Sequence, residues 1–509
     1  MELQSMDGTN KRPSAPRRNS FAAPEYLSGA KLVTVSISIT VVAFLMMVDI
    51  SIISTAVPRI TEDFDSLDDI AWYAAIYQLS SAAVQPLMGK IYGKFNTKWT
   101  FVAFFALFEL GSALCGAAVS SSMLIVGRAV AGMGASGLNN GALTIVTCIV
   151  PLHRRPSLTG FLMGFSQLGI VLGPLLGGVL TTYASWRWCF YINLPLGALT
   201  VVGLLVVPIP DTTEKAKALS ILPNIHHELD LIGFALFSPA SVMLLLALQY
   251  GADGLPWSSP KTIGLFCGSG ATYAVWTAWN WYRGDEALIP FSILKKRVVW
   301  SCSLTQWCNM TIVFSAAYFL PLYFQFVRGV SPVLSGVSML PSIGTQLISA
   351  MVSGVLVEKT GYVVPYAVFA GVVGAVSNGL YTTLTPTTST GRWIGYQILN
   401  GAGRGTGMQM QLLAVQTVLS TTDLPVAMGI LVFSGQYGTA VMMAISNAIF
   451  SKGIMGVSQT IPMRYALGIS HVFYMIAGVG AVSVFTSLFM GWADVRTRDK
   501  RASVVPSEV

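Results

Sequence analysis

Long apolar runs follow one another along the chain from Leu32 almost to the C-terminus, and short polar or basic stretches separate them. Each run has about 20 residues, which is enough for an α-helix to cross the hydrocarbon core of a bilayer. The pattern predicts an all-α polytopic membrane protein with fourteen transmembrane helices. We place them at 32–57, 71–89, 99–119, 122–149, 157–183, 188–207, 230–249, 261–282, 301–324, 332–357, 363–382, 391–415, 426–450 and 470–492.

The composition excludes several other classes of protein. Of the 509 residues, 53% are hydrophobic and only 10% are charged, whereas a soluble domain carries about 25% charged residues. The six cysteines form no CxxC pair, so neither a disulfide framework nor a metal site is predicted. The motifs G-x-x-x-x-G-K-[ST], HExxH and GxSxG do not occur in the sequence. We therefore expect neither an enzyme nor an ATP-driven pump, and we expect no cofactor.

Basic residues are distributed unevenly over the predicted loops. With the N-terminus in the cytosol, the cytosolic segments hold 21 of the 30 Lys and Arg residues, and the opposite loops hold seven. Positively charged loops stay on the cytosolic side of a membrane, so both termini are predicted to be cytosolic. This placement explains the net charge of +8 without a nucleic-acid partner. We expect the plasma membrane as the location, with a vacuolar or vesicular membrane as the open alternative.

Polar segments flank the membrane region. The first thirty residues are polar, basic and rich in Ser and Pro, which is typical of a disordered tail and not of a signal peptide. The expected organisation has five parts. They are a cytosolic tail at 1–31, a six-helix bundle at 32–207, a linker with two extra transmembrane helices at 208–300, a second six-helix bundle at 301–492, and a cytosolic tail at 493–509.

Three patterns of small and polar residues occur in both the first six and the last six spans. Gly354 follows Gly89 by 265 residues, and each ends a second span before a basic turn. Gln397 follows Arg128 by 269 residues, and each begins an x-x-x-x-G-x-G pattern. The third match, also at 269 residues, pairs Gly160, Gln167 and Gly169 with Gly429, Gln436 and Gly438. The matches indicate a duplication, and two repeated halves around a central site are the architecture of many secondary transporters.

Four motifs resemble those of the major facilitator superfamily, and within it those of the fourteen-spanner drug:proton antiporters, especially fungal exporters of toxins and secondary metabolites. They are LMMVD with AVP (45–49 and 56–58), LIVGRAVAGMG (124–134), GFSQLGIVLGPLLGG (164–178) and WRWCFYINLPLG (186–197). The resemblance implies a major-facilitator fold of two six-helix bundles and two extra linking helices, with spans one and four lining a central cavity. The loop between spans two and three departs from the superfamily's Asp-Arg-x-Gly-Arg-Lys, because it reads GKFNTK (93–98) and has no carboxylate.

Four ionisable residues fall inside predicted spans, namely Asp49, Glu109, Arg128 and Arg404. Each costs about 2.5–3.5 kcal/mol to insert and therefore needs a reason to be there. Asp49 and Arg128 lie at nearly one depth and are interpreted as a proton-switched pair; the alternative is a static ion pair. Glu109 is either a further proton carrier or a protonated structural residue. Arg404 either anchors an acidic or carbonyl-rich cargo or is satisfied by backbone carbonyls.

The remaining candidate residues are polar side chains of the cargo path and small residues of the fifth span. Gln167 and Gln436, with Tyr77 and Gln78 as weaker candidates, either line the path or form interhelical hydrogen bonds. The fifth-span motif is expected to act as a hinge and seal between the halves, because its glycines permit close helix packing and its proline removes a backbone hydrogen bond. Its residues are Gly164, Gly169, Gly173, Pro174, Gly177 and Gly178.

The function predicted from these residues and from the resemblance is proton-coupled export of a hydrophobic small molecule, namely a secondary metabolite, toxin or drug, by alternating access. The cargo is acidic in the interpretation in which Arg404 anchors it. The expected partners are this cargo, protons and the lipid bilayer, and we expect a monomer. Two alternatives stay open at this point. One is proton-coupled uptake of a nutrient or siderophore, and the other is a membrane receptor or scaffold that transports nothing.

Overall fold

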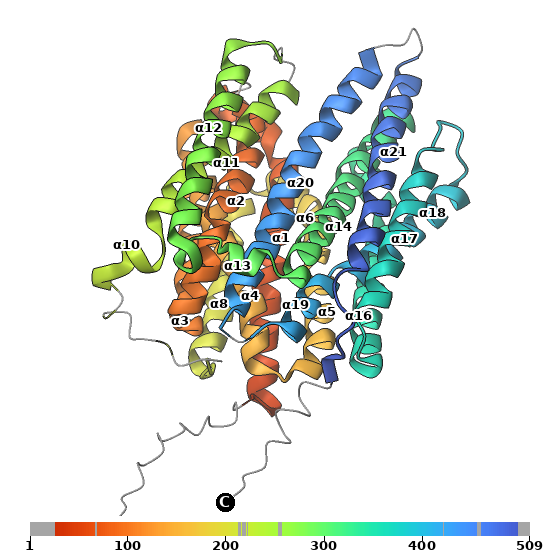
Figure 1. Cartoon of the computed structure of the whole chain (residues 1–509). Helices are drawn as coiled ribbons and strands as arrows, with labels where there is room; N and C mark the ends of the chain where they lie inside the picture. The colour runs from red at the N-terminus through yellow and green to blue at the C-terminus, as the bar shows by residue number, and fades with distance from the viewer. Residues whose placement is uncertain are drawn as a thin grey trace, which may run out of the picture.

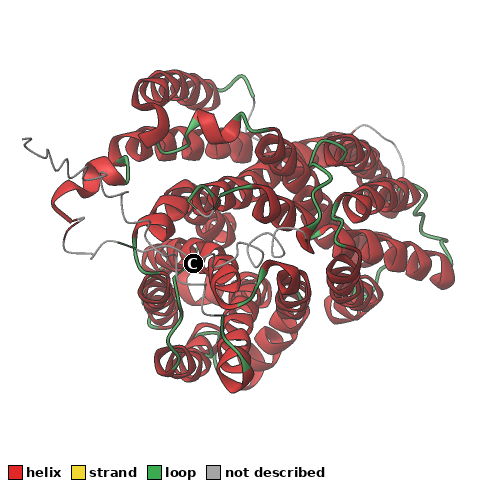
Figure 2. Cartoon of the chain, turned by 60° about the horizontal axis from the view of Figure 1, so that its bottom comes forward, coloured by secondary structure: helices red, strands yellow, loops and turns green. Residues whose placement is uncertain are grey.

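The computed structural model describes residues 26–66, 69–211, 215, 220, 222–252, 257–420, 422–455 and 460–496. Within these residues all regular secondary structure is helical (Figures 1 and 2). The predicted all-α class is therefore confirmed. Most of the two predicted tails, residues 1–25 and 497–509, lies outside the described residues.

Fourteen helical passes succeed one another in the described part of the chain, the number expected from the sequence. Ten of them are long and apolar enough by composition alone to cross a membrane. The passes are α1 (Gly29–Phe64), α2 (Ile70–Lys94), α3 (Thr97–Gly116), α4 (Ser121–Ile149), α5 and α6 (Arg155–Ser166 and Leu168–Tyr183), α7 and α8 (Trp188–Tyr191 and Asn193–Val206), α11 (Leu231–Ala252), α12 (Pro260–Arg283), α14 (Arg297–Leu322) with the π-helix η5 (Tyr323–Val327), α15 and α16 (Pro332–Ser338 and Leu340–Thr360), α17 (Val364–Tyr381), α18 and α19 (Thr390–Gly407 and Met410–Val418), α20 (Leu424–Met455) and α21 (Ile461–Ser487).

The two ends of the bundle differ in the segments that they carry. α1 begins and α21 ends at the lower end in Figure 1, which we call the terminal end. The chain before α1 is joined to the end of α4 there, since Leu27 N–H donates to the Ile149 carbonyl at 3.1 Å. We call the opposite end the distal end. At the distal end α1 continues seven residues beyond its predicted end, held by the Arg59–Glu62 ion pair of 2.7 Å within its last turns.

The repeated glycines make matching contacts in the two halves. A Cβ on Gly429 of α20 would lie 3.0 Å from the Cα of Gly89 of α2, and a Cβ on Gly160 of α5 would lie 2.6 Å from the carbonyl oxygen of Ala350 of α16. Only glycine permits helices to approach so closely. The duplication read from the sequence thus appears in space as two equivalent helix crossings, α2 with α20 and α5 with α16.

The extra helices α11 and α12 pack beside one of these crossings. The Phe237 ring of α11 lies 5.2 Å from the Phe433 ring of α20, and the Tyr273 hydroxyl of α12 is 2.9 Å from the Tyr437 hydroxyl of α20. α11 also packs on α2. The pair therefore covers the line along which α2 of the first half meets α20 of the second half (Figure 1).

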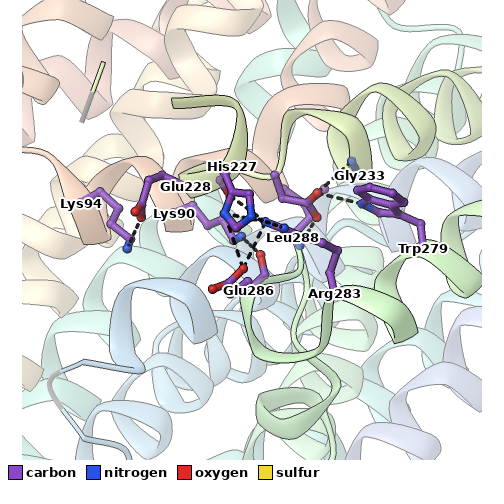
Figure 3. A network of polar contacts seen from close by, with 10 residues as sticks. Lys90, Lys94, His227, Glu228, Gly233, Trp279, Arg283, Glu286 and Leu288 are labelled. Carbon is purple, nitrogen blue, oxygen red and sulfur yellow. Dashed lines mark hydrogen bonds and ion pairs between the residues drawn. The ribbon is translucent and has the colours of Figure 1, made fainter. Parts of the chain in front are cut away.

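A polar network at the terminal end connects α2 to the segment that precedes α11 and to the segment that follows α12 (Figure 3). Lys94 binds Glu228 of α10 (Ile225–Glu228) at 2.5 Å, and Lys90 donates to the Glu286 carbonyl. The hydrogen bond from Lys94 lowers the pKa of the Glu228 carboxyl below its usual value. Buried Asp230 accepts from Gly233 N at 3.1 Å, Trp279 Nε1 at 2.9 Å and Leu288 N at 2.7 Å.

A carboxylate from elsewhere in the chain reaches the turn between α2 and α3, whose own sequence lacks one. Asp211 accepts from Asn96 Nδ2 at 2.6 Å and from the backbone N–H of Thr97 at 3.0 Å, and it pairs with Lys215 at 3.0 Å. Lys98 Nζ donates to two backbone carbonyl oxygens of the segment that precedes Asp211, each at 2.9 Å. The acidic partner of this turn is thus supplied by the chain that follows α8.

Candidate transport site

Asp49 of α1 and Arg128 of α4 form a fully buried ion pair. Arg128 Nη1 donates to Asp49 Oδ2 at 2.6 Å, and the side chains are 1% and 0% exposed respectively. Glycines bring α4 against its neighbours, because a Cβ on Gly134 would lie 2.5 Å from the backbone nitrogen of Phe108. The structure therefore brings together the two residues paired on sequence grounds, and their titration stays a prediction.

Aromatic residues enclose the Arg128 guanidinium. Its centre lies 4.4 Å from the Tyr77 ring and 5.9 Å from the Phe190 ring, and its Nε donates to the Tyr73 carbonyl at 3.1 Å. Ring faces stabilise a cation when water is excluded. Tyr77 is thus a wall of the ion-pair site, whereas Gln78, on the next face of α2, is exposed.

Two polar residues that the sequence interpretation did not single out complete this site. Asn193, the first residue of α8, donates from Nδ2 to Asp49 Oδ1 at 3.4 Å and to Ser112 Oγ of α3 at 3.2 Å. Asn193 belongs to the WRWCFYINLPLG motif, which was the available signal. A buried amide side chain at the start of an apolar helix is costly unless it forms hydrogen bonds. The bond to Asp49 offsets this cost and makes Asn193 part of the ion-pair site.

Glu109 of α3 lies close to this site but outside its hydrogen bonds. Both carboxyl oxygens are buried, and neither has a hydrogen-bond partner among the described residues. The carboxyl group packs against Gly197 of α8. The structure thus places the third predicted proton-coupling residue in the same half as Asp49, without a direct bond to it.

Arg404 of α18 is buried in the second half without a carboxylate partner among the described residues. Its Nη1 donates to Ser342 Oγ of α16 at 3.3 Å, and its Nε finds no hydrogen-bond partner within the described part of the chain. The nearby Tyr381 hydroxyl of α17 is likewise buried, and none of the residues that the structure describes bonds to it. A cation buried with spare donors can bind an anionic group strongly.

The two glutamines of the repeat have different surroundings. Gln436 of α20 accepts a hydrogen bond from Ser81 Oγ of α2 at 3.3 Å, which is one of the two roles left open for it. Gln167 is buried and lies where the fifth pass is interrupted, between α5 and α6. Gln167 N–H bonds to the Gly164 carbonyl at 3.2 Å, three residues back, which makes a tight turn.

The interruption in this pass therefore lies at Gln167 and not at Pro174. α6 continues through Pro174, since proline removes one hydrogen bond but its fixed φ suits a helix. The motif's glycines instead pack on α1. A Cβ on Gly169 would lie 2.8 Å from the backbone nitrogen of Val48, and a Cβ on Gly173 would lie 3.0 Å from that of Ile52. Close packing is the contribution that the geometry supports for this motif.

A pair of neighbouring glycines tests that packing. Gly173→Ala is expected to lower the stability of the purified protein by roughly 1–3 kcal/mol, because the methyl group meets the α1 backbone. Gly178→Ala is the matched control, since nothing lies within 4 Å of a Cβ there. Thermal unfolding in detergent measures both, and equal melting temperatures would contradict the packing role.

A polytopic helical bundle with repeated glycine crossings and an ion pair buried between α1 and α4 is typical of a secondary membrane transporter. The chain belongs to the major facilitator superfamily, whose family model, Major Facilitator Superfamily, matches residues 39–443. It is 47% identical to MFS-type transporter pigP of Monascus ruber, over 96% of this chain and 91% of that protein. It is 43% identical to efflux pump mlcE of Penicillium citrinum, over 94% of each chain. A crystal structure of a double Trp mutant of XylE shares the fold at a TM-score of 0.63 and 12% identity, covering 93% of this chain and 99% of XylE.

The family membership confirms the broad predictions from the sequence. The chain is a multi-pass membrane protein with the major-facilitator fold, and it is a small-molecule transporter, not an enzyme. The receptor or scaffold alternative is therefore not supported.

Proposed function

We propose that the protein exports a hydrophobic small molecule, of the secondary-metabolite, toxin or drug class, in exchange for protons. The names of its relatives support export, since mlcE is an efflux pump. The buried Asp49–Arg128 pair is the observation that carries proton exchange, because an ion pair inside a membrane protein is costly without a function. Protonation of Asp49 would release Arg128, and loss of that proton would restore the pair.

The proposed motion is alternating access between two halves, at 32–207 and 301–492. The equivalent glycine crossings of α2 with α20 and of α5 with α16 support this division. Both crossings lie toward the terminal end, so they would close the path there while cargo leaves at the distal end. One chain contains both halves, and a monomer is sufficient for the cycle.

The proposed orientation places the terminal end in the cytosol. Basic side chains gather at that end, which is the side favoured for positive charge. They are Lys90, Lys94, Lys98, Arg154, Arg155, Arg283, Lys295, Lys296, Arg297, Lys359 and Arg496. With this orientation in the plasma membrane, the inward proton gradient would drive cargo out of the cell.

The proposed cargo is acidic or rich in carbonyl groups. The spare donors of Arg404 support this, because a buried guanidinium without a carboxylate partner favours an anionic ligand. Gln167 and Gln78 are proposed to lie along the cargo path.

Flux into proteoliposomes tests the function. The probes are 7-methoxycoumarin-3-carboxylate and the corresponding neutral carboxamide, which share the ring system and have nearly the same size, while only the first is charged. We expect a pH step to drive probe movement opposite to the protons. Movement in the same direction as the protons would indicate uptake by symport. A probe flux that is the same with and without the pH step would exclude proton coupling.

A further inference from the structure

The carboxyl group of Glu109 occupies the space beside Gly197 of α8, where a side chain is absent. A Cβ on Gly197 would come within 2.8 Å of the Glu109 carboxyl carbon, so any larger residue at that position would displace the group. Both carboxyl oxygens are shielded from solvent and have no hydrogen-bond partner among the described residues. A buried carboxylate without a hydrogen bond or counter-ion is unstable. These surroundings favour the protonated form of the group in this conformation.

The charges around Glu109 lead to the same conclusion. Asp49 on α1 is the charged group that acts on Glu109 directly. The other titratable and charged groups on the helices around this site are Tyr77 on α2, Cys115 on α3, Arg128 on α4, and Cys189 and Tyr191 on α7. α8 has no charged or titratable side chain. Arg128 is the one cation in this group, and it is already bound to Asp49. An ionised Glu109 would be a second negative charge beside a single cation.

Two polar side chains connect the interface around Glu109 to Asp49. Ser112 lies one helical turn along α3 from Glu109, and Asn193 lies one turn along α8 from Gly197. Asn193 Nδ2 donates to both Ser112 Oγ at 3.2 Å and Asp49 Oδ1 at 3.4 Å. The Oδ1 atom of Asn193 is buried and has no donor among the residues described, which leaves an acceptor in the α3–α8 interface.

We propose that Glu109 is a second proton site of the transporter and that Asn193 is the positioning residue that couples it to Asp49. Each transport cycle then exchanges two protons for one cargo molecule, one proton on each carboxyl group. The inference rests on the proposed proton-coupled function. A purely structural acid would bond to its neighbours, whereas Glu109 and the Asn193 acceptor are both unpaired.

Infrared difference spectroscopy of the purified full chain tests the protonation of Glu109 without any cargo. We expect the carbonyl stretch of a protonated carboxyl group at neutral pH in the wild type and in Asp49→Asn. Glu109→Gln should remove that band while leaving the melting temperature unchanged, since glutamine resembles the protonated acid in shape. A band that persists in Glu109→Gln overturns the proposal.

Transport at equilibrium tests the number of protons. Proteoliposomes hold the membrane potential at zero with potassium and valinomycin, and 7-methoxycoumarin-3-carboxylate is the probe. Two protons support an accumulation that changes by about 100-fold per pH unit, and one proton supports about tenfold. We expect the two-proton dependence of accumulation on pH for the wild type and the one-proton dependence for Glu109→Gln. Equal slopes overturn the second site, whereas a wild type without any pH-driven accumulation contradicts the proposed function itself.

A pair of α8 variants tests the positioning role. Asn193→Leu removes both amide hydrogen bonds and should reduce the slope to that of Glu109→Gln. Thr200→Val is the matched control, because the Thr200 hydroxyl donates to the Gly197 carbonyl of its own helix, at 2.7 Å. A wild-type slope in Asn193→Leu overturns the positioning role.

Discussion

Asp49→Asn is expected to abolish proton-driven accumulation of the coumarin probes while the protein still folds and inserts. Asparagine has nearly the size of aspartate and can accept a hydrogen bond from Arg128, so the packing of α1 on α4 is kept. It cannot bind and release a proton, so Arg128 is no longer switched. The proton on Glu109 acts on the cycle only through Asp49, so a pH step can no longer perform work on the cargo. The measurement is probe accumulation in proteoliposomes, which should fall to the ratio reached by passive leak.

The matched control is Asp65→Asn at the exposed distal end of α1. Asp65 has a φ of 48°, a left-handed conformation that asparagine also adopts readily. This variant should accumulate the probes like the wild type. Asp49 is not the proton carrier if Asp49→Asn vesicles still concentrate a probe against its gradient after a pH step.

Arg404→Gln is expected to weaken binding of the coumarin carboxylate by roughly ten- to a hundredfold, which corresponds to the loss of a charged hydrogen bond. Binding of the neutral carboxamide should change much less, because it depends on apolar contact. Arg404→Lys should restore part of the affinity, since a point charge lacks the planar two-pronged geometry of a guanidinium. Competition binding to the purified protein measures all three effects.

Arg392→Gln is the matched control for Arg404, because Arg392 is exposed in the first turn of the same helix. It should leave the affinity for both probes unchanged. An equal loss for the carboxylate and the carboxamide in Arg404→Gln would mean that Arg404 holds α16 and α18 together and does not select the cargo.

The order of the helices and the Asp49–Arg128 ion pair were predictable from the sequence for a simple physical reason. A membrane span needs a long apolar run, and a charge inside one stands out against it. The interruption at Gln167 was not predictable, because both sides of it are helical and apolar, and the strongest helix-breaking signal nearby was Pro174. The structure shows that a proline is tolerated where its φ fits the helix.

The partners of charged groups were the least predictable feature. Asn193 and Ser112 are separated by 81 residues along the chain, and only the packing of α3 on α8 brings them together. Asp211 reaches the turn at Thr97 across 114 residues, so the folded protein supplies an acid that the turn's own sequence lacks. A single sequence shows which groups need a partner, and tertiary structure decides which partner they obtain.

The network of Figure 3 bears on how the protein is assembled during synthesis. All its members, from Lys90 to Leu288, precede α14 in the chain, so the network can form before the second half emerges from the ribosome. Domains fold in the order in which they are synthesised. α2 and α11 would then present a finished surface when α20 is inserted. Substitutions in this network should act at that step: they should reduce the amount of inserted protein, while each molecule that does assemble keeps its normal turnover.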